Sequence, residues 1–524
     1  MTSIALAPDL QNSAHSVSPE MLARFDIAGP RYTSYPTADR FVEAFGADDY
    51  GAAARQRRLG ASARSPISLY VHIPFCASLC YYCACNKIVT RHESRGREYL
   101  RYLSKEIDLH VARLGPGTPV SQLHLGGGTP TFLSDEDLAD LMRMLREAFS
   151  FSPSGEYAIE IDPRTVDAGR LAHLAHLGFN RLSFGVQDFD PAVQHAVHRI
   201  QPAKQVFDLV ASARQLPFQS INVDLIYGLP RQSVASFDRT LAQVCELQPD
   251  RIALYAYAHL PDRFKPQRRI ATSDLPYAAV KNEMLARSIA ALTEAGYVYI
   301  GMDHFARPDD ALAVAKRQGR LHRNFQGYST QPDCDLIALG VSAIGHVGGT
   351  YSQNAKTLEE YYDHLDQGRL PVVRGLGLSR DDVLRRAVIM AIMCQGHVDF
   401  QSIGIAHLVD FRDHFATELA ALGQLSADGL VQVTDHDLTV TDKGWFFVRA
   451  VAMVFDRFLQ TDRKRALLPD HLKMTGHLGK DDDSILRNKP GGPARRTRVR
   501  ASCDLHCRHA RKPRRCFGSA QLAP

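Results

Sequence analysis

Short hydrophobic runs alternate with amphipathic stretches from residue 68 to residue 257. The runs that have the apolar character of buried strands are Ser68–Phe75, Ser121–Leu125, Tyr157–Ile161, Arg181–Val186, Ile221–Ile226 and Arg251–Tyr257. The stretches of helical period between them are Glu98–Leu114, Asp135–Phe149, Ala168–Leu177, Ala203–Leu216 and Val234–Leu247. Alternating strands and helices predict a parallel sheet. Six repeats are too many for a small open sheet and too few for a closed eight-fold barrel. We therefore predict an α/β fold based on an incomplete (β/α)6 barrel of the TIM type.

The pattern changes after the sixth strand. A helix over Tyr277–Ala295 and a strand over Tyr297–Met302 are followed by a loop rich in Arg, His and Gly that runs to about Thr330. After Ser379 the chain reads as mostly helical. It closes with a hairpin-like pair between residues 429 and 444, which resembles a small winged-helix domain and indicates a lid or packing module.

These patterns divide the chain into five parts. They are an N-terminal arm (1–55), the partial barrel (56–310), a barrel extension with ligand-binding loops (311–378), a mostly helical C-terminal domain (379–465) and a basic tail (466–524). The tail lacks periodicity, and we expect it to be disordered. Its Cys503, His506, Cys507, His509 and Cys516 are compatible with a zinc site, but their spacing is weak evidence for one, and chance composition is the favoured explanation.

Composition and charge exclude several classes of protein. A chain of 524 residues with 45% hydrophobic and 23% charged residues is typical of a soluble protein with more than one ordinary core. Residues 485–524 hold eleven Lys or Arg and one acid, so the remaining 51 basic and 56 acidic residues give no sign of nucleic-acid binding. Met1–Val17 has no signal-peptide pattern, and the longest apolar run, Ala387–Met393, is too short to cross a membrane. We therefore expect a cytoplasmic protein.

Four of the ten cysteines lie between Cys76 and Cys85, directly after the first strand. In a reducing compartment such a cluster indicates metal ligands rather than disulfides. Tetrahedral zinc prefers two separated ligand pairs, whereas a [4Fe-4S] cluster accepts three thiolates from one tight loop. The spacing of Cys76, Cys80 and Cys83 fits the cluster and leaves its fourth iron open. An open iron can hold the amino and carboxylate groups of a methionine moiety beside a one-electron donor. We expect Cys85 to line the site without binding the cluster.

A second motif, Leu125–Pro130, ends the second predicted strand with three consecutive glycines. Consecutive glycines let the backbone approach a ligand closely. A bare tight turn is the alternative, and the phosphate-binding GxGxxG pattern is absent.

The cysteine spacing matches the CxxxCxxC motif of the radical S-adenosylmethionine superfamily. Further blocks narrow the resemblance: Gly29–Thr37, His72–Cys85, Gly185–Phe189, Asp224–Pro230, Gly301–Arg307 and Asn324–Tyr328. Together they resemble oxygen-independent coproporphyrinogen III oxidase (dehydrogenase) across residues 20 to 460. This resemblance implies oxidative decarboxylation of two propionates of coproporphyrinogen III to vinyl groups, which yields protoporphyrinogen IX without dioxygen.

The resemblance also implies a cofactor set of one [4Fe-4S] cluster on Cys76, Cys80 and Cys83 and two molecules of S-adenosylmethionine. The residues implied to contact the first molecule are Tyr70, Gly127, Glu160 and Ile344. Those implied to contact the second are Tyr82, Gly128, Thr129, Gln187, Arg199, Asp224 and Ala258. Arg199 suits a methionine carboxylate, and Glu160 and Asp224 suit ribose hydroxyls or an ammonium group. For each of these three a structural ion pair is the alternative.

The substrate of this family carries four carboxylates and so needs a cationic cavity. The basic residues in the family-specific segments are Arg31, His304, Arg307, His322 and Arg323. A solvated basic loop is the alternative for any one of them. The sequence singles out no catalytic residue. We expect a monomer whose partners are coproporphyrinogen III and an unidentified electron donor and acceptor. Two rival functions stay open, a haem-binding chaperone-type paralogue without decarboxylase activity and a zinc-binding structural protein.

Overall fold

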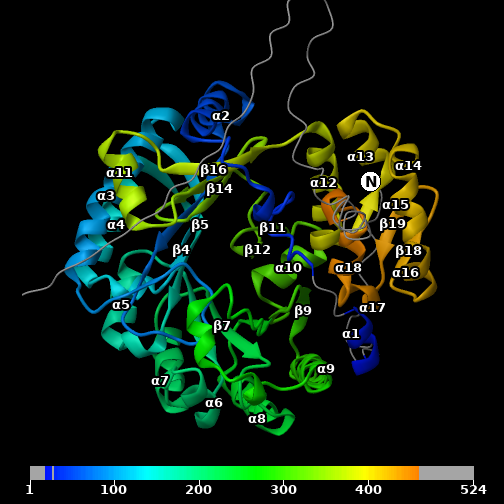
Figure 1. The fold of residues 1–524 in the computed structure, drawn as a ribbon, viewed down its shortest axis with the longest axis horizontal. Helices are drawn as coiled ribbons and strands as arrows, with labels where there is room; N and C mark the ends of the chain where they lie inside the picture. The colour runs from blue at the N-terminus through cyan, green and yellow to red at the C-terminus, as the bar shows by residue number, and fades with distance from the viewer. Residues whose placement is uncertain (1–17, 26–28, 460–524) are drawn as a thin grey trace, which may run out of the picture. The chain divides into compact units, whose positions relative to one another are not determined.

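A twelve-stranded sheet forms the centre of the computed structural model, which describes residues 18–25 and 29–459 (Figure 1). Its strand order is β16-β15-β14-β13-β1-β4-β5-β6-β7-β8-β10-β9. The six predicted strands are all present and parallel: β1 (Ile67–Ile73), β4 (Thr118–Gly127), β5 (Phe149–Ile161), β6 (Arg181–Gln187), β7 (Ser220–Tyr227) and β8 (Arg251–Ala256). Their order in the sheet is their order in the chain, as in a barrel wound in one direction.

Helices cover the outer side of these strands, as Figure 1 shows. The five predicted helices are α3 (Ser94–Leu114), α4 (Asp135–Ala148), α5 (Ala168–His176), α7 (Ala203–Arg214) and α8 (Val234–Leu247). The other helices of the N-terminal three quarters are α1 (Pro19–Phe25), α2 (Ala47–Leu59), α6 (Pro191–Ala196), α9 (Ala278–Glu294), α10 (Ala311–Arg317) and α11 (Leu358–Asp366). Serine begins α4 and α8 by accepting a hydrogen bond from the third residue of each helix.

The parallel block has a seventh member, β13 (Leu336–Leu339), which pairs with β1 on the side away from β4. Antiparallel strands continue the sheet beyond both ends of the block. They are β14 (Ile344–Val347), β15 (Thr350–Asn354) and β16 (Val372–Gly377) at one end, and β10 (His304–Ala306) and β9 (Val298–Gly301) at the other. The incomplete barrel is confirmed, and the partner for β1 comes from far along the chain.

The segment after Met302 is not the continuous loop that we predicted. It contains β10, α10 and a hairpin of β11 (His322–Asn324) and β12 (Gly327–Ser329). Each of these strands has three residues, too few for a visible alternation of apolar and polar positions. Tertiary contacts hold the hairpin instead, because the Tyr328 hydroxyl donates to the Met393 carbonyl at 2.9 Å.

The C-terminal part is mostly helical, as predicted. Its helices are α12 (Arg380–Gln395), α13 (Phe400–His407), α14 (Phe411–His414), α15 (Ala416–Ala421), α16 (Gly423–Ala427), α17 (Asp442–Trp445) and α18 (Val448–Met453). A small sheet of β17 (His397–Asp399), β19 (Asp437–Val440) and β18 (Val431–Val433) includes the predicted hairpin. The Trp445 indole N–H donates to the Ile300 carbonyl at 2.9 Å and so ties this part to β9.

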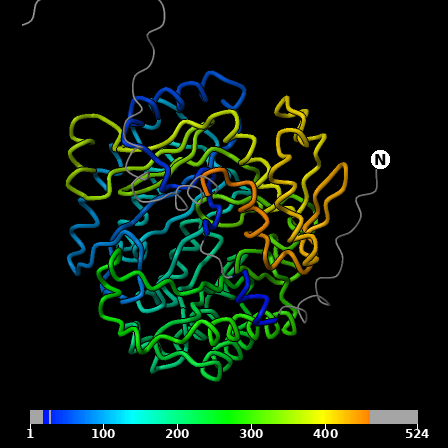
Figure 2. The backbone as a smooth tube through the Cα atoms, turned by 45° about the vertical axis from the view of Figure 1, so that its right-hand side comes forward, coloured from blue at the N-terminus to red at the C-terminus, as the bar shows by residue number. Residues whose placement is uncertain are grey.

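The N-terminal arm meets the last described residues of the chain, which follow α18. The Tyr32 hydroxyl donates to Asp456 at 3.0 Å, and the Tyr35 hydroxyl accepts from the Arg457 backbone at 3.2 Å. Figure 2 shows the blue and orange segments side by side. The basic tail and its cysteines lie outside the described residues. Within the described ranges, no helix has the length and apolar character needed to cross a membrane.

Candidate active site

The cysteine loop follows β1 and is closed by a short parallel pair, β2 (Phe75–Cys76) with β3 (Ile88–Val89). The side chains of Cys76 and Cys80 are buried, Cys83 is half-buried and Cys85 is exposed. All four line one cavity of about 420 Å³, which is within the usual range for small-molecule sites. The cavity also touches Gly127, Ile161 and Gln187, so it lies where β4, β5 and β6 end. Active sites of barrel enzymes lie at this end of the strands.

Cationic and polar groups point at the sulfur atoms. The guanidinium groups of Arg164 and Arg199 each come within 3.6 Å of Cys80 Sγ, and the Thr129 hydroxyl lies 3.5 Å from Cys76 Sγ. Asp162 holds both arginines, with oxygens 2.6 Å from Arg164 and 3.1 Å from Arg199. Burial raises the pKa of Asp162, but Arg199 and Arg164 outweigh burial and hold that pKa at about 2. The Asp162 carboxylate and the two guanidinium groups therefore carry one net positive charge beside Cys80.

This environment fits a thiolate-bound iron–sulfur cluster. Hydrogen bonds and positive charge at the sulfurs stabilise thiolates and the reduced state of a cluster. Across the described ranges, no three His, Cys, Asp or Glu side chains converge tightly enough to hold a single metal ion. Zinc prefers two separated ligand pairs, whereas Cys76, Cys80 and Cys83 lie in one tight loop, which suits the cube.

The glycine motif after β4 lies against the cysteine loop and is more than a bare turn. Gly127 has φ +117°, and a Cβ there would lie 2.7 Å from Cε1 of His72. A Cβ on Gly128 would lie 2.8 Å from the Phe75 carbonyl oxygen. Only glycine fits these positions, because the backbone is left-handed at Gly127 and in contact with the loop at Gly128.

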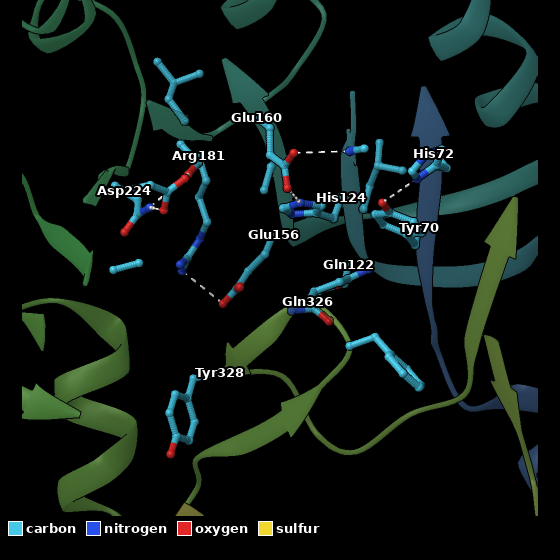
Figure 3. Close-up of a pocket in the computed structure, with 18 of the residues that line it drawn as sticks. Tyr70, His72, Gln122, His124, Glu156, Glu160, Arg181, Asp224, Gln326 and Tyr328 are labelled. Atoms are coloured by element: carbon cyan, nitrogen blue, oxygen red, sulfur yellow. Dashed lines mark hydrogen bonds and ion pairs between the residues drawn. The ribbon is translucent and has the colours of Figure 1, made fainter. Parts of the chain in front are cut away.

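A second cavity, of about 520 Å³, adjoins the first (Figure 3). Six residues line both cavities: Cys85, Gly127, Glu160, Ser183, Asp224 and Tyr255. In Figure 3, Glu160 and His124 point toward each other, and Nε2 of His124 lies 3.2 Å from Glu160 Oε1. The other Glu160 oxygen accepts from the Gly127 N–H at 3.2 Å. The two cavities thus share a wall that carries two carboxyl groups.

The second of these carboxyl groups, Asp224, is held in place by neutral donors. It accepts from the Asn222 amide at 2.8 Å and from the Ser183 hydroxyl at 3.1 Å. Burial, followed by the charge of Glu160, raises the pKa of Asp224 to about 6. Asp224 therefore changes its charge near neutral pH.

The structure brings together all but one of the residues predicted to bind the cluster and S-adenosylmethionine. Besides the ligand cysteines, those lining the first cavity only are Tyr82, Gly128, Thr129, Gln187 and Arg199. Those lining the second only are Tyr70 and Ile344, and those lining both are Gly127, Glu160 and Asp224. Ala258 lines neither cavity. The Gln267 side-chain amide donates hydrogen bonds to the backbone carbonyls of both Ala258 and Tyr82. The Arg199 guanidinium is already engaged by Asp162, Cys80 and the Gly185 carbonyl.

Of the predicted substrate residues, His304 alone lines a cavity, the second one. Arg31 lies behind this cavity's wall, with its guanidinium 5.2 Å from the centre of the Tyr255 ring and 3.1 Å from Asp303. Arg323 lies behind it too, 4.5 Å from the Tyr328 ring, and donates to the Arg31 carbonyl at 3.2 Å.

The remaining two predicted substrate residues lie elsewhere. Arg307 follows β10, where its backbone N–H donates to Asp250 just before β8 begins, at the opposite end of the barrel from the cysteine loop. His322 lines neither cavity.

His304 is neutral at physiological pH. Burial, followed by the charges of Arg323 and Arg31, lowers the pKa of its imidazole to about 3. Nδ1 lies 2.8 Å from the Met302 carbonyl, which can only accept, so Nδ1 carries the proton and Nε2 is an acceptor. His304 therefore offers the cavity an acceptor rather than a positive charge.

Several polar residues of the site were not predicted from the sequence. Arg164 contacts Cys80 and is held by Asp162. Arg181 and Arg251, at the start of β6 and β8, line the second cavity. Arg181 pairs with Glu156 at 3.0 Å, as Figure 3 shows. One feature of the sequence could have indicated Arg181 and Arg251. Each is the first residue of a strand that is otherwise mostly apolar, and a charge at a buried position needs a partner or a ligand.

Comparison with known proteins bears on this site. The family description "Radical SAM superfamily" matches residues 70–244, and "HemN C-terminal domain" matches residues 378–447. The oxygen-independent coproporphyrinogen III oxidase of Pseudomonas aeruginosa is 49% identical over 442 residues, which cover 84% of this chain and 95% of that protein. The enzyme of the same name from Escherichia coli strain K12 is 48% identical over 440 residues, with the same two coverages.

The chain belongs to the oxygen-independent coproporphyrinogen III oxidase family. A solved structure of coproporphyrinogen III oxidase from Escherichia coli, described as a radical SAM enzyme, superposes with TM-score 0.78 at 49% identity. The match covers 82% of this chain and 97% of that one. As a radical SAM enzyme, the protein uses a [4Fe-4S] cluster and S-adenosylmethionine.

Arg164→Gln is expected to make the reduction potential of the bound cluster more negative, on the order of 50–100 mV, because one positive charge beside Cys80 is lost. A potentiometric titration followed by electron paramagnetic resonance measures this shift. Arg97→Gln, in an exposed ion pair with Glu136, is the matched control and should leave the potential unchanged. A potential that does not move in Arg164→Gln would contradict the assigned effect on Cys80.

Asp224→Asn is expected to flatten the pH dependence of stability of the cofactor-free protein. The raised pKa means that folded Asp224 keeps a proton that an unfolded chain has already lost. The folded state is therefore penalised as pH rises from about 4 to above 6, by roughly 3 kcal/mol at most. Denaturant unfolding across this range measures the effect. The free energy of unfolding of Asp224→Asn should increase relative to that of the original protein as the pH rises. Parallel stability profiles of the two proteins would rule out this titration.

Proposed function

We propose that this protein converts two propionate side chains of coproporphyrinogen III to vinyl groups without dioxygen, in porphyrin and haem biosynthesis. The observation that carries the proposal is the pair of joined cavities. One contains the CxxxCxxC loop, and the other extends from it into the barrel. A radical made at the cysteine loop would meet a substrate across the shared wall without leaving the protein.

The cluster and S-adenosylmethionine, when bound, supply a hydrogen-abstracting deoxyadenosyl radical. Cys76, Cys80 and Cys83 would hold the cluster, and Arg164, Arg199 and Thr129 would stabilise it through the sulfurs. Cys85 would line the site without binding iron. It is exposed, and it touches both cavities.

We further propose that two molecules of S-adenosylmethionine bind. The family resemblance implies one molecule on the cluster and one beside it, and residues of both sets line the two adjoining cavities. Tyr70 and Ile344 of the first set line only the second cavity. Tyr82, Gly128, Thr129, Gln187 and Arg199 of the second set line only the cavity of the cysteine loop. Glu160 and Asp224, in the shared wall, would accept from ribose hydroxyls or an ammonium group.

Substrate carboxylates require positive charge at the second cavity. Arg181 and Arg251 line this cavity directly, and Arg31 and Arg323 lie behind Tyr255 and Tyr328. Among the substrate residues predicted from the sequence, we propose Arg31 and Arg323 as the cationic pair, with neutral His304 shaping the wall between them. Arg307 and His322 stay predictions.

We also propose that the protein acts as a monomer in the cytoplasm, with an external electron donor and acceptor. The cysteines in the described ranges are all free thiols, as a reducing compartment requires. We retain the five-part division of the chain, noting that α2 runs past residue 55 to Leu59.

Incubation of the cluster-loaded protein with coproporphyrinogen III, S-adenosylmethionine and dithionite under strict anaerobiosis tests the function. We expect divinyl product, carbon dioxide, methionine and 5′-deoxyadenosine. Cys80→Ala is the control that should lose both iron and product. Stable stoichiometric haem binding with no product would overturn the proposal in favour of a haem carrier.

Arg31→Ala is expected to raise the KM for coproporphyrinogen III by about tenfold, because one cation near the propionates is lost. The iron content and kcat should stay close to those of the original protein. Arg24→Ala removes a similar exposed pair with Asp428 and should leave KM unchanged. An unaltered KM in Arg31→Ala would remove Arg31 from the substrate site.

A further inference from the structure

Four basic side chains crowd into one short segment beside the cysteine loop. Arg263, Lys265, Arg268 and Arg269 are all exposed, and none forms an ion pair within the ranges that the structure describes. One acid, Asp262, adjoins them. Before residue 485 the chain as a whole carries more acidic than basic side chains, so this local excess of positive charge runs against the general balance.

The segment is fixed directly to the loop that carries the ligand cysteines. It forms the short helix η7 (Lys265–Arg269), whose one buried side chain, Gln267, donates to the Tyr82 carbonyl at 3.0 Å. The Arg269 guanidinium lies 5.1 Å from the centre of the Tyr81 ring and 3.4 Å from its hydroxyl. Tyr81 and Tyr82 are the two residues after Cys80, so the basic segment is only one layer of side chains from a cluster ligand.

A fifth basic residue, Lys356, approaches the same loop from another part of the chain. Its carbonyl accepts from the Asn86 amide at 3.0 Å, just after Cys85. Burial, followed by the charges of Arg374 and Arg263, lowers the pKa of the exposed Lys356 ammonium. Lys356 therefore lies close enough to Arg263 for their like charges to repel each other.

The underlying packing gives this surface a fixed form. Ile270, the residue after η7, belongs to a small buried apolar cluster with Val197, Leu229 and Tyr257. The rings of Tyr81 and Tyr82 pack against the same cluster. A set of charges held on rigid elements can be complementary to one partner, whereas solvated side chains on a mobile loop are not.

We propose that Arg263, Lys265, Arg268, Arg269 and Lys356, called here the basic surface, dock an acidic one-electron carrier protein. The inference rests on the proposed function, because reductive cleavage of S-adenosylmethionine consumes one electron from outside. In each encounter one electron passes from the carrier, for example from a flavin hydroquinone that becomes a semiquinone, to the oxidised cluster. Electrostatic steering toward the basic surface would place the carrier against Tyr81, the residue next to Cys80.

Charge reversal tests the docking. Arg263→Glu, Lys265→Glu and Arg268→Glu are combined in one variant, and Arg269 is kept because it packs on Tyr81. With reduced flavodoxin, a small acidic flavoprotein, as the probe, stopped-flow spectroscopy follows reduction of the cluster in the loaded protein. We expect the second-order rate constant to fall at least tenfold at low salt and to lose most of its dependence on ionic strength. A titration should show a matching rise in Kd for flavodoxin.

The matched control places the same three charge reversals at exposed arginines elsewhere. The control variant combines Arg55→Glu, Arg58→Glu and Arg64→Glu, at exposed positions on α2 and in the turn after it. α2 packs against α3, β15 and β16. This variant should keep at least half the original rate with flavodoxin. Equal rates in the two variants would overturn the proposal.

Dithionite separates failure of the docking surface from failure of the function. The basic-surface variant should be reduced by dithionite, and should form product with it, as fast as the original protein. If neither protein forms product with dithionite, the proposed function fails, while the flavodoxin Kd still reports on the surface. A raised KM for coproporphyrinogen III with unchanged flavodoxin binding would overturn the proposal and assign the surface to the substrate. Tighter binding of a single-stranded oligonucleotide than of flavodoxin would also overturn it.

Discussion

The negative charge of three cysteine thiolates in one short loop is the constraint on which the rest of the site depends. The protein stabilises this negative charge without adding a fourth cysteine ligand. Two guanidinium groups approach Cys80, a hydroxyl approaches Cys76, and one aspartate keeps the two arginines apart and oriented. Because Asp162 stays ionised down to about pH 2, this arrangement persists across the physiological range. Positive charge thus stabilises the sulfurs while the open side of the loop stays available to a small molecule.

The ends of the parallel strands convert that loop into a two-chamber site. β4 contributes the glycines that pack on the loop, β5 contributes Glu160, and β7 contributes Asp224. Each carboxyl group has donors of its own, so neither is an unpaired buried charge. The hairpin of β11 and β12 completes the second chamber with Gln326 and Tyr328. It is held by the C-terminal helices through the Met393 carbonyl. A part of the chain far from the cysteine loop in the sequence therefore shapes the second chamber.

Local signals in the sequence were enough to predict much of this. The six strands and the five helices between them depend on periodicity within a few residues, and all are confirmed. The cysteine spacing is equally local, and the radical SAM family that it indicates is confirmed. The predictions failed where the structure depends on distant partners. β13 is a four-residue run that becomes a barrel strand only by pairing with β1, and β11 and β12 are too short to show a period. Arg164 reaches Cys80 from a different loop. Neutral His304 owes its charge state to burial and then to the charges of Arg323 and Arg31, which no single segment reveals.

The parallel pairing of β1 with β13 has a consequence for how the enzyme is made. β1 leads straight into the cysteine loop, yet its second neighbour in the sheet is made more than half a chain length later during synthesis. A ribosome that has released only the first six strands has exposed the cysteines while one edge of β1 still lacks its partner. Iron–sulfur assembly on the nascent chain would therefore meet a loop with an incomplete scaffold. Stable loading is therefore expected to wait until residues beyond Leu339 have emerged, which makes it a late step in the synthesis of this enzyme.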